Sequence, residues 1–389
     1  TETSIKAEKY QIAYAQPQLG ERVRVFLNWE GYRAEQANFS AFDRNRLLWE
    51  GELKGDKLGF RDGQAVLHSY RFFFGVSTNP GDGGAVRWAY AQPRHNVMSS
   101  DLAGDAVLFV AQDGELGALD KNNGGRVLTA RVDLKPGQQV LGATFDAAGF
   151  APSRDKVQPP TPLLEALRGI VFDKDSSFVS VKLFAVQALG ALPAGKEATA
   201  ELLRVITAEG LPPQLGRAAG EVLIARKDKQ AADLVVASLK QSYDFLEDRR
   251  PRGLETLARV AAALDIEDAA PVLGERLLDP STGAPAIKEI VAALTSIGKG
   301  QNARPAGSRA LRDLLLMYRS DPAFQNDPVA LQRAGEGLLA LDGDAGRRTV
   351  SFVALEPHSL SPLKTYFHKL LDDTAPKLLP LGADLPKNK

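Results

Sequence analysis

The chain has 389 residues, which is enough for two or more domains with cores of their own. Lysine plus arginine and aspartate plus glutamate total 48 each, so no net charge attracts the chain to nucleic acid or anionic lipid. Cysteine is absent, which excludes disulfides, thiolate metal sites and a cysteine nucleophile.

Short strands are predicted over the first third of the chain, after an extended lead-in at residues 1–20. Residues 106–133 are the best-defined stretch, because strand-like runs there alternate with the turns Gln112–Gly114 and Asp120–Gly125, rich in Gly, Asn and Asp. Another turn is expected at residues 79–84. The expected strands are those at residues 22–27, 39–43, 47–49, 64–67, 72–76, 86–88 and 140–145, together with three within 106–133.

These strands recur with a period near 39 residues. Trp49, Trp88 and Leu128 follow one another at intervals of 39 and 40, and Asp43, Asp82 and Asp120 at intervals of 39 and 38. Such a period built from short strands is the length of one β-propeller blade. We expect each Asp to cap a hairpin turn and each large apolar residue after it to pack between neighbouring sheets.

The third copy, Gly114-Glu-Leu-Gly-Ala-Leu-Asp120 with Gly124 or Gly125 and Val127-Leu128, resembles the quinoprotein-type propeller repeat. This repeat occurs in pyrroloquinoline-quinone (PQQ) dehydrogenases and in the cofactor-free propeller lipoprotein of the bacterial outer-membrane assembly machinery. The resemblance covers about residues 20–150 and implies propeller blades. Three blades do not close a ring, which needs at least four. We favour a larger propeller whose N-terminal part is missing; the alternatives are degenerate blades within residues 1–20 and a sandwich of three meanders.

The pattern changes after the Pro-rich segment 151–162, where the apolar period becomes that of a helix. Paired helices at intervals of 33 to 44 residues indicate an α-solenoid of about five HEAT-like units over residues 161–355, with a compact helical bundle as the alternative. Residues 300–308 are expected to form a loop insertion. The expected helices are those beginning at residue 163 and those at 181–192, 199–208, 215–225, 231–240, 254–264, 269–278, 287–297, 309–318, 331–341 and 363–371.

The sequence therefore predicts a multidomain chain of the β-then-α class. The predicted parts are PQQ-like β-propeller blades at residues 1–150, a linker at 151–162, a HEAT-like α-helical repeat domain at 163–372 and an extended C-terminal tail at 373–389.

Motifs for catalysis, cofactor binding or metal binding were not found, so we predict no such residues and no cofactor. The four histidines lack metal-ligand spacing, and the Gly-rich turns do not lead into helices as phosphate-binding loops do. Residues 342–346 begin like a calcium loop but lack the later acidic ligand, so they are interpreted as a helix stop. The candidate partner contacts are Arg249, Arg250 and Arg252 in an inter-helix loop and Leu378, Leu379 and Leu381 in the tail.

These observations favour a non-catalytic protein–protein interaction scaffold. The resemblance to the outer-membrane assembly propeller implies a subunit of a periplasmic or outer-membrane-associated complex in a bacterial envelope. Neither nucleic acid nor a membrane-spanning segment is expected, and any lipid anchor is expected before Thr1. The first alternative is a quinone-dependent oxidoreductase with the rest of its propeller missing, and the second is a HEAT-type bilin lyase.

Overall fold

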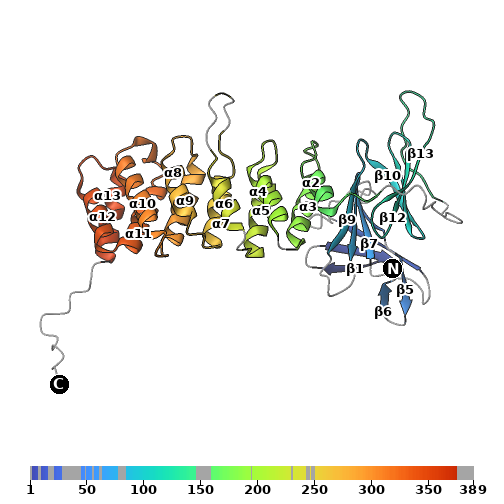
Figure 1. Cartoon of the computed structure of the whole chain (residues 1–389), viewed down its shortest axis with the longest axis horizontal. Helices are drawn as coiled ribbons and strands as arrows, with labels where there is room; N and C mark the ends of the chain where they lie inside the picture. The colour runs from blue at the N-terminus through green and yellow to red at the C-terminus, as the bar shows by residue number, and fades with distance from the viewer. Residues whose placement is uncertain are drawn as a thin grey trace, which may run out of the picture. The chain divides into compact units, whose positions relative to one another are not determined.

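The computed structural model describes residues 2–7, 10–15, 22–28, 45–48, 50–54, 57–60, 64–77, 85–145, 159–193, 195–228, 231–241, 246 and 250–374, with side chains from Gln64 onward. Antiparallel sheets precede helices along the chain, so the predicted β-then-α layout is confirmed (Figure 1). The chain divides into two compact units, one of residues 1–193 with 211–218 and one of residues 194–210 with 219–389.

The strands are β1 (Glu2–Ala7), β2 (Tyr10–Ala15), β3 (Arg22–Asn28), β4 (Asn45–Leu48), β5 (Glu50–Lys54), β6 (Lys57–Phe60), β7 (Gln64–Ser69), β8 (Phe72–Ser77), β9 (Val86–Ala91), β10 (Val97–Ala103), β11 (Ala106–Ala111), β12 (Glu115–Asp120) and β13 (Arg126–Arg131). The helices are α2 (Leu163–Val171), α3 (Val179–Ala191), α4 (Lys196–Thr207), α5 (Pro213–Arg226), α6 (Ala232–Leu239), α7 (Leu254–Ala263), α8 (Ala269–Leu278), α9 (Ala284–Ile297), α10 (Arg304–Tyr318), the short 3₁₀ helix η4 (Pro322–Phe324), α11 (Val329–Asp342), α12 (Asp344–Leu355) and α13 (Ser361–Asp373).

The strands of the first unit form three antiparallel sheets. One is five-stranded in the order β1-β2-β3-β5-β6. We call the second, β4-β7-β8-β9, the central sheet, and the third, β10-β11-β12-β13, the meander sheet. The first expected copy does not form a sheet of its own, because β3 joins the five-stranded sheet while β4 pairs with β7 in the central sheet. No sheet among the described strands closes on itself.

Two predicted segments of this region differ from the structure, and two others lie outside the described residues. The lead-in at residues 1–20 contains the hairpin β1–β2. Val140–Phe145 is irregular instead of a strand, with the Val140 amide bonded to the Gln112 carbonyl oxygen at 2.9 Å and the Ala143 amide to Ser99 Oγ at 2.9 Å. The expected strand at residues 39–43 and the expected turn at residues 79–84 are the two outside the described part of the chain.

The central and meander sheets share one irregularity at the same place. The ladder between β8 and β9 shifts register between Gly75 and Val76, and Trp88 lies opposite Gly75. The ladder between β12 and β13 shifts between Ala118 and Leu119, and Leu128 lies opposite Ala118. The 40-residue interval between Trp88 and Leu128 therefore joins equivalent positions in the two sheets.

The two equivalent residues have different surroundings. Trp88 is buried, and its Nε1 donates to the Lys121 carbonyl oxygen at 2.8 Å. A Cβ atom on Gly124 would lie 2.4 Å from the indole ring, so the turn after β12 accepts the ring only with glycine there. Asp120 caps this turn by accepting from the Asn122 amide at 2.7 Å, as predicted. Leu128 is 36% exposed, so packing between sheets was predicted correctly for Trp88 and wrongly for Leu128.

Three consecutive phenylalanines place β8 in the middle of three layers, because successive side chains of a strand point to opposite faces. Phe73 faces the meander sheet, with its ring centroid 5.5 Å from that of Phe109. Phe72 and Phe74 face the helices: Phe72 lies 5.2 Å from Phe178 at the start of α3, and Phe74 lies 5.0 Å from Phe184 within α3. All three phenylalanine side chains of β8 are fully buried, which explains why α2 and α3 belong to the same compact unit as the sheets.

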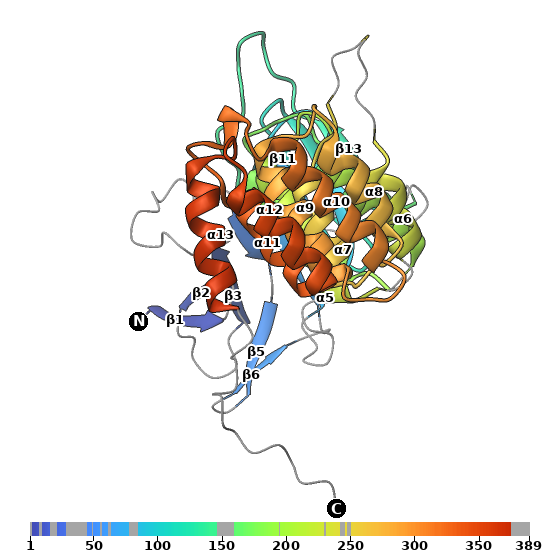
Figure 2. The ribbon, with the colours of Figure 1, turned by 90° about the vertical axis from the view of Figure 1, so that its left-hand side faces the viewer.

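The helices of the second unit form two layers. In one layer α4 contacts α6, α6 contacts α8, α8 contacts α10 and α10 contacts α12. In the other layer α7 contacts α9, α9 contacts α11 and α11 contacts α13. Each helix thus packs mainly on its neighbours in sequence and on the next helix but one, as in a row of helix pairs (Figures 1 and 2). None of the described helices is both long and apolar enough to cross a membrane.

Most helix bounds agree with the prediction within a few residues, and two do not. The predicted loop insertion at residues 300–308 is wrong in its second half, because α10 begins at Arg304, where Pro305 fits the first helical turn. The predicted stop at residues 342–346 does end α11, at Gly343 with a φ of +51°, but the chain then continues directly into α12, which was not predicted.

Candidate functional site

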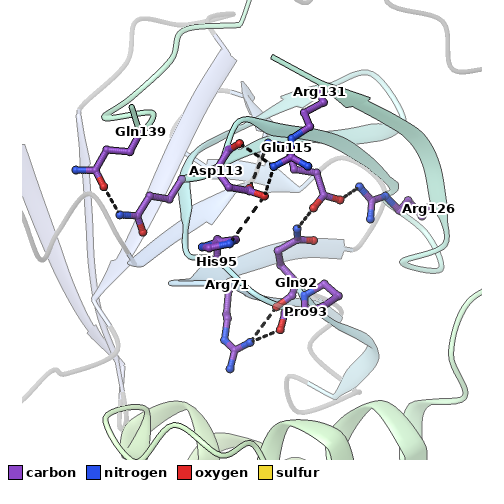
Figure 3. Close-up of polar contacts among 10 residues, drawn as sticks. Arg71, Gln92, Pro93, His95, Asp113, Glu115, Arg126, Arg131 and Gln139 are labelled. Atoms are coloured by element: carbon purple, nitrogen blue, oxygen red, sulfur yellow. Dashed lines mark hydrogen bonds and ion pairs between the residues drawn. The ribbon is translucent and has the colours of Figure 1, made fainter. Parts of the chain in front are cut away.

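Polar side chains gather at one end of the central and meander sheets. The connections β7–β8, β9–β10 and β11–β12 all lie at this end, because every second connection of an antiparallel meander is on the same side. We call the polar side chains that meet there the loop-end cluster, and Figure 3 shows its members except Tyr90. Its members are Arg71, Tyr90, Gln92, His95, Gln112, Asp113, Glu115, Arg126, Arg131 and Gln139.

Four members close a ring of polar contacts. Gln92 Nε2 donates to Glu115 Oε2 at 2.6 Å, and Arg126 forms an ion pair with the other carboxylate oxygen of Glu115. Arg126 Nη1 donates to the Tyr90 hydroxyl at 3.3 Å, and that hydroxyl donates to Gln92 Oε1 at 3.0 Å. Burial raises the pKa of Tyr90, while Arg126 acts in the opposite direction and Glu115 in the same one. The ring therefore satisfies the buried Gln92 and the three half-buried polar groups with one another.

Asp113 is the second acid of the cluster, and its side chain is 20% exposed. Its carboxylate accepts from the Glu115 amide at 3.3 Å, which fixes the turn, and pairs with Arg131 Nη2 at 3.2 Å. His95 Nε2 lies 3.9 Å from the same carboxylate. The Arg131 and His95 side chains are 70% and 44% exposed. The predicted turn at Gln112–Gly114 is confirmed, with Gly114 at a φ of +85°.

Arg71 connects this end of the sheets to the first helices. Its guanidinium donates to the backbone oxygens of Gln92 at 3.2 Å and Pro93 at 2.9 Å, and to Asp173 Oδ2 at 2.5 Å. The side chains of this ion pair are only 12% and 14% exposed. Lys182 Nζ donates to the Asp173 backbone oxygen at 2.5 Å; burial lowers the pKa of this lysine, which Asp173 and Asp175 partly oppose.

A second polar pair lies inside the first unit. Ser100 Oγ is 2.8 Å from His68 Nδ1, and His68 Nε2 is 2.9 Å from the Tyr70 backbone oxygen. A carbonyl oxygen can only accept, so the imidazole carries a proton on Nε2 and accepts from the serine on Nδ1. His68 stacks on Phe73 with 4.6 Å between ring centroids, and both His68 and Ser100 are buried. The pair resembles a serine–histidine dyad in composition, but both side chains are buried.

The second unit carries an open groove of about 510 Å³ on one of its two layers. The groove lies across α7, α9, α11 and the connection before α11, and its apolar lining residues are Ala284 and Pro285. Its charged lining residues are the carboxylates Glu255, Glu289 and Asp327 and the cations Arg259, Lys288 and Arg333. Lys288 Nζ donates to Asp327 Oδ2 at 2.6 Å across the groove, and this hydrogen bond lowers the pKa of Asp327. The groove thus presents both signs of charge side by side.

Of the sequence-predicted contacts, the structure describes Arg250 and Arg252, and neither lines this groove. Arg250 is exposed, and Arg252 Nη2 pairs with Glu209 at 2.7 Å, while Gln241 holds the Arg252 backbone. Arg249 and the tail leucines Leu378, Leu379 and Leu381 lie outside the described residues. The groove residues were missed because their polar positions on α7 and α9, such as Glu255 and Arg259 one turn apart, follow the ordinary pattern of a solvated helix face.

Within the described part of the chain, no three histidine or acidic side chains are grouped so as to hold a metal ion. Asp342, which opened the suspected calcium loop, accepts instead from Ser308 Oγ at 2.7 Å and from Arg312 Nη2 at 2.6 Å. These contacts hold the end of α11 against α10. No protein-family model and no curated protein sequence matches this chain.

Proposed function

We propose that the chain is a non-catalytic scaffold that binds other proteins, and that its groove across α7, α9 and α11 is the principal binding surface. The observation that carries the proposal is the groove itself: successive helices of one layer contribute to it, so a partner contacts several helix pairs at once. Its alternating charges suit a partner segment that carries both acidic and basic side chains.

The finer architecture belongs to the same proposal. The shared register shift in the central and meander sheets, 40 residues apart, supports quinoprotein-like blades, and the two-layered helix pairs support HEAT-like repeats. By resemblance to the outer-membrane assembly propeller, the scaffold belongs to a periplasmic or outer-membrane-associated complex in a bacterial envelope. Cell fractionation of the full reading frame tests the location, and accumulation in the cytoplasm would contradict it.

Reversing charges in the groove tests the binding surface. The variant Arg259→Glu with Arg333→Glu changes two exposed groove cations. The matched control, Arg304→Glu with Arg309→Glu, makes the same change of charge on exposed positions of α10 in the other layer. We expect proteins that co-purify with the wild-type chain from native membranes to be lost from the groove variant and kept by the control.

The reading of this experiment does not depend on the identity of the partner. Equal recovery of partners by the groove variant and by the wild type would show that the groove is not the binding surface. A wild-type chain that elutes with no other protein would contradict the scaffold function itself.

A further inference from the structure

Strand β13 is an exposed edge of the meander sheet. Among the described strands it pairs with β12 alone. Thr129, Ala130 and Arg131 are exposed, and Leu128 and Val132 are 36% and 39% exposed, although both are large apolar residues. An open edge of this kind is a template for another strand unless the protein blocks it.

The direction of the backbone groups follows from one hydrogen bond. The Val132 amide donates to the Gly114 carbonyl oxygen at 2.8 Å, toward β12. Residues two and four positions earlier, Ala130 and Leu128, direct their backbone groups the same way, because the direction alternates along an antiparallel strand. Thr129 and Arg131 therefore direct their N–H and C=O groups away from β12, toward the open side.

The usual protections of an edge strand are weak over Leu128–Val132. Proline is absent from this segment, and the register shift lies before it, beside Val127. The two arginines of β13 are paired with acids of the neighbouring turn and strand: Arg126 with Glu115, and Arg131 with Asp113. Their charges thus act within the sheet, and neither repels an approaching strand as an unpaired lysine at an edge does.

We propose that β13 pairs with β13 of a second copy of this chain, antiparallel and around a two-fold axis at Ala130. In this register Leu128 lies opposite Val132 of the second copy, and the axis repeats this contact, so each exposed apolar residue of the edge covers another. Thr129 lies opposite Arg131, and the two such pairs exchange about four backbone hydrogen bonds. A two-fold axis requires this kind of self-complementary surface. The two meander sheets become one continuous sheet.

The absence of cysteine provides a direct test of the register. Ala130 faces Ala130 of the second copy in a pair without mutual hydrogen bonds, where Cα atoms lie about 4.5 Å apart, within the range that a disulfide spans. Ala130→Cys should therefore give a covalent dimer on mild oxidation, seen by non-reducing electrophoresis. Leu128→Cys alone should not give a covalent dimer. In this register Val132 lies opposite Leu128, and Leu128 of the second copy lies four residues further along the partner strand. A mixture of Leu128→Cys and Val132→Cys should give the mixed dimer.

A second variant tests the pairing without a new cysteine. Thr129→Pro removes an N–H group that points to the open side and leaves the amides directed to β12 in place. We expect the wild type to sediment as a dimer and Thr129→Pro as a monomer, with Thr129→Val still a dimer and all three giving the same far-UV circular dichroism. A monomeric wild type, or cross-linking of Leu128→Cys as fast as Ala130→Cys, would overturn the proposal, and the cysteine variants decide the matter if Thr129→Pro does not fold.

Discussion

The core of the sheets and the core of the helical unit are built in different ways. The sheets depend on a few large rings that meet from distant parts of the sequence, such as Phe73, Trp88 and Phe109. The helical unit is filled by leucine, valine and alanine, and each helix contacts its near neighbours in the chain. A local loss should therefore spread through the whole sheet core, whereas in the helices it should stay near its origin.

Phe73→Ala should have the largest effect. The side chain is fully buried and contacts His68, Tyr90 and Phe109, so its removal should lower the free energy of unfolding of the first unit by about 3–5 kcal/mol. Hydrogen exchange should become faster in the central sheet, in the meander sheet and in α2–α3 together. The matched control is Leu294→Ala in α9, also fully buried, for which faster exchange should be confined to α9 and the helices that contact it.

That contrast can fail in a clear way. If Leu294→Ala accelerates exchange along the helical unit from α4 to α13, the unit unfolds as one cooperative body and the comparison between the two regions is wrong.

Removing the cation of an ion pair should show the next largest difference between the two regions. Arg71→Met leaves Asp173 half-buried without its cation, and we expect a loss of about 2–3 kcal/mol in the free energy of unfolding. Lys288→Met breaks an ion pair of more exposed side chains, so we expect a smaller loss in the free energy of unfolding than for Arg71→Met. Urea titrations at low and high salt measure the free energy of unfolding of both variants. A larger loss for Lys288→Met than for Arg71→Met would show that the Arg71–Asp173 pair does not fasten the sheets to α2 and α3.

The smallest effects concern two tyrosines whose pKa values are raised for different reasons. A hydrogen bond to Glu336 is the main cause that raises the pKa of Tyr366 to about 12, whereas burial is the main cause for Tyr90. A raised pKa means that the folded chain holds the phenol proton more tightly than the unfolded chain. For Tyr366 the resulting stabilisation is complete below about pH 10 and is lost as the pH rises toward 12.

Glu336→Gln should return the titration of Tyr366 toward pH 10, because the acceptor loses its negative charge. Glu115→Gln should change Tyr90 much less, because its burial remains. Difference absorbance at 295 nm against Tyr366→Phe and Tyr90→Phe assigns each titration. Equal shifts in the two acid variants would mean that a charge, and not burial, controls Tyr90 as well.

The meander at residues 106–133 could be predicted because the interactions that form its turns are between residues close in sequence. Gly114 and Asp120 specify their turns through their own backbone angles and hydrogen bonds, so the sequence around them is sufficient. Val140–Phe145 has the composition of a strand but lies across the meander sheet, where single contacts to Gln112 and Ser99 hold it, so the competing tertiary contacts decided its conformation.

The loop-end cluster could not be predicted from spacing. Gln92, Glu115 and Arg126 come from three different strands or loops, and Arg126 reaches Glu115 only in the register that the shift beside Val127 produces. The exposure of Leu128 was missed for a related reason. Its place in the repeat matches that of Trp88, but β13 is the last strand of its sheet and no described element covers it as the meander sheet covers Trp88.

The two-sided burial of β8 has a consequence for biosynthesis. Phe74 leaves the ribosome 110 residues before Phe184, the side chain that covers it. At about 5–20 residues per second, this delay lasts roughly 5–20 s. During this time the nascent central sheet presents Phe72 and Phe74 to its surroundings without α3. Synthesis thus has a window in which holdase chaperones are expected to engage the nascent chain, and release is expected once α3 has emerged.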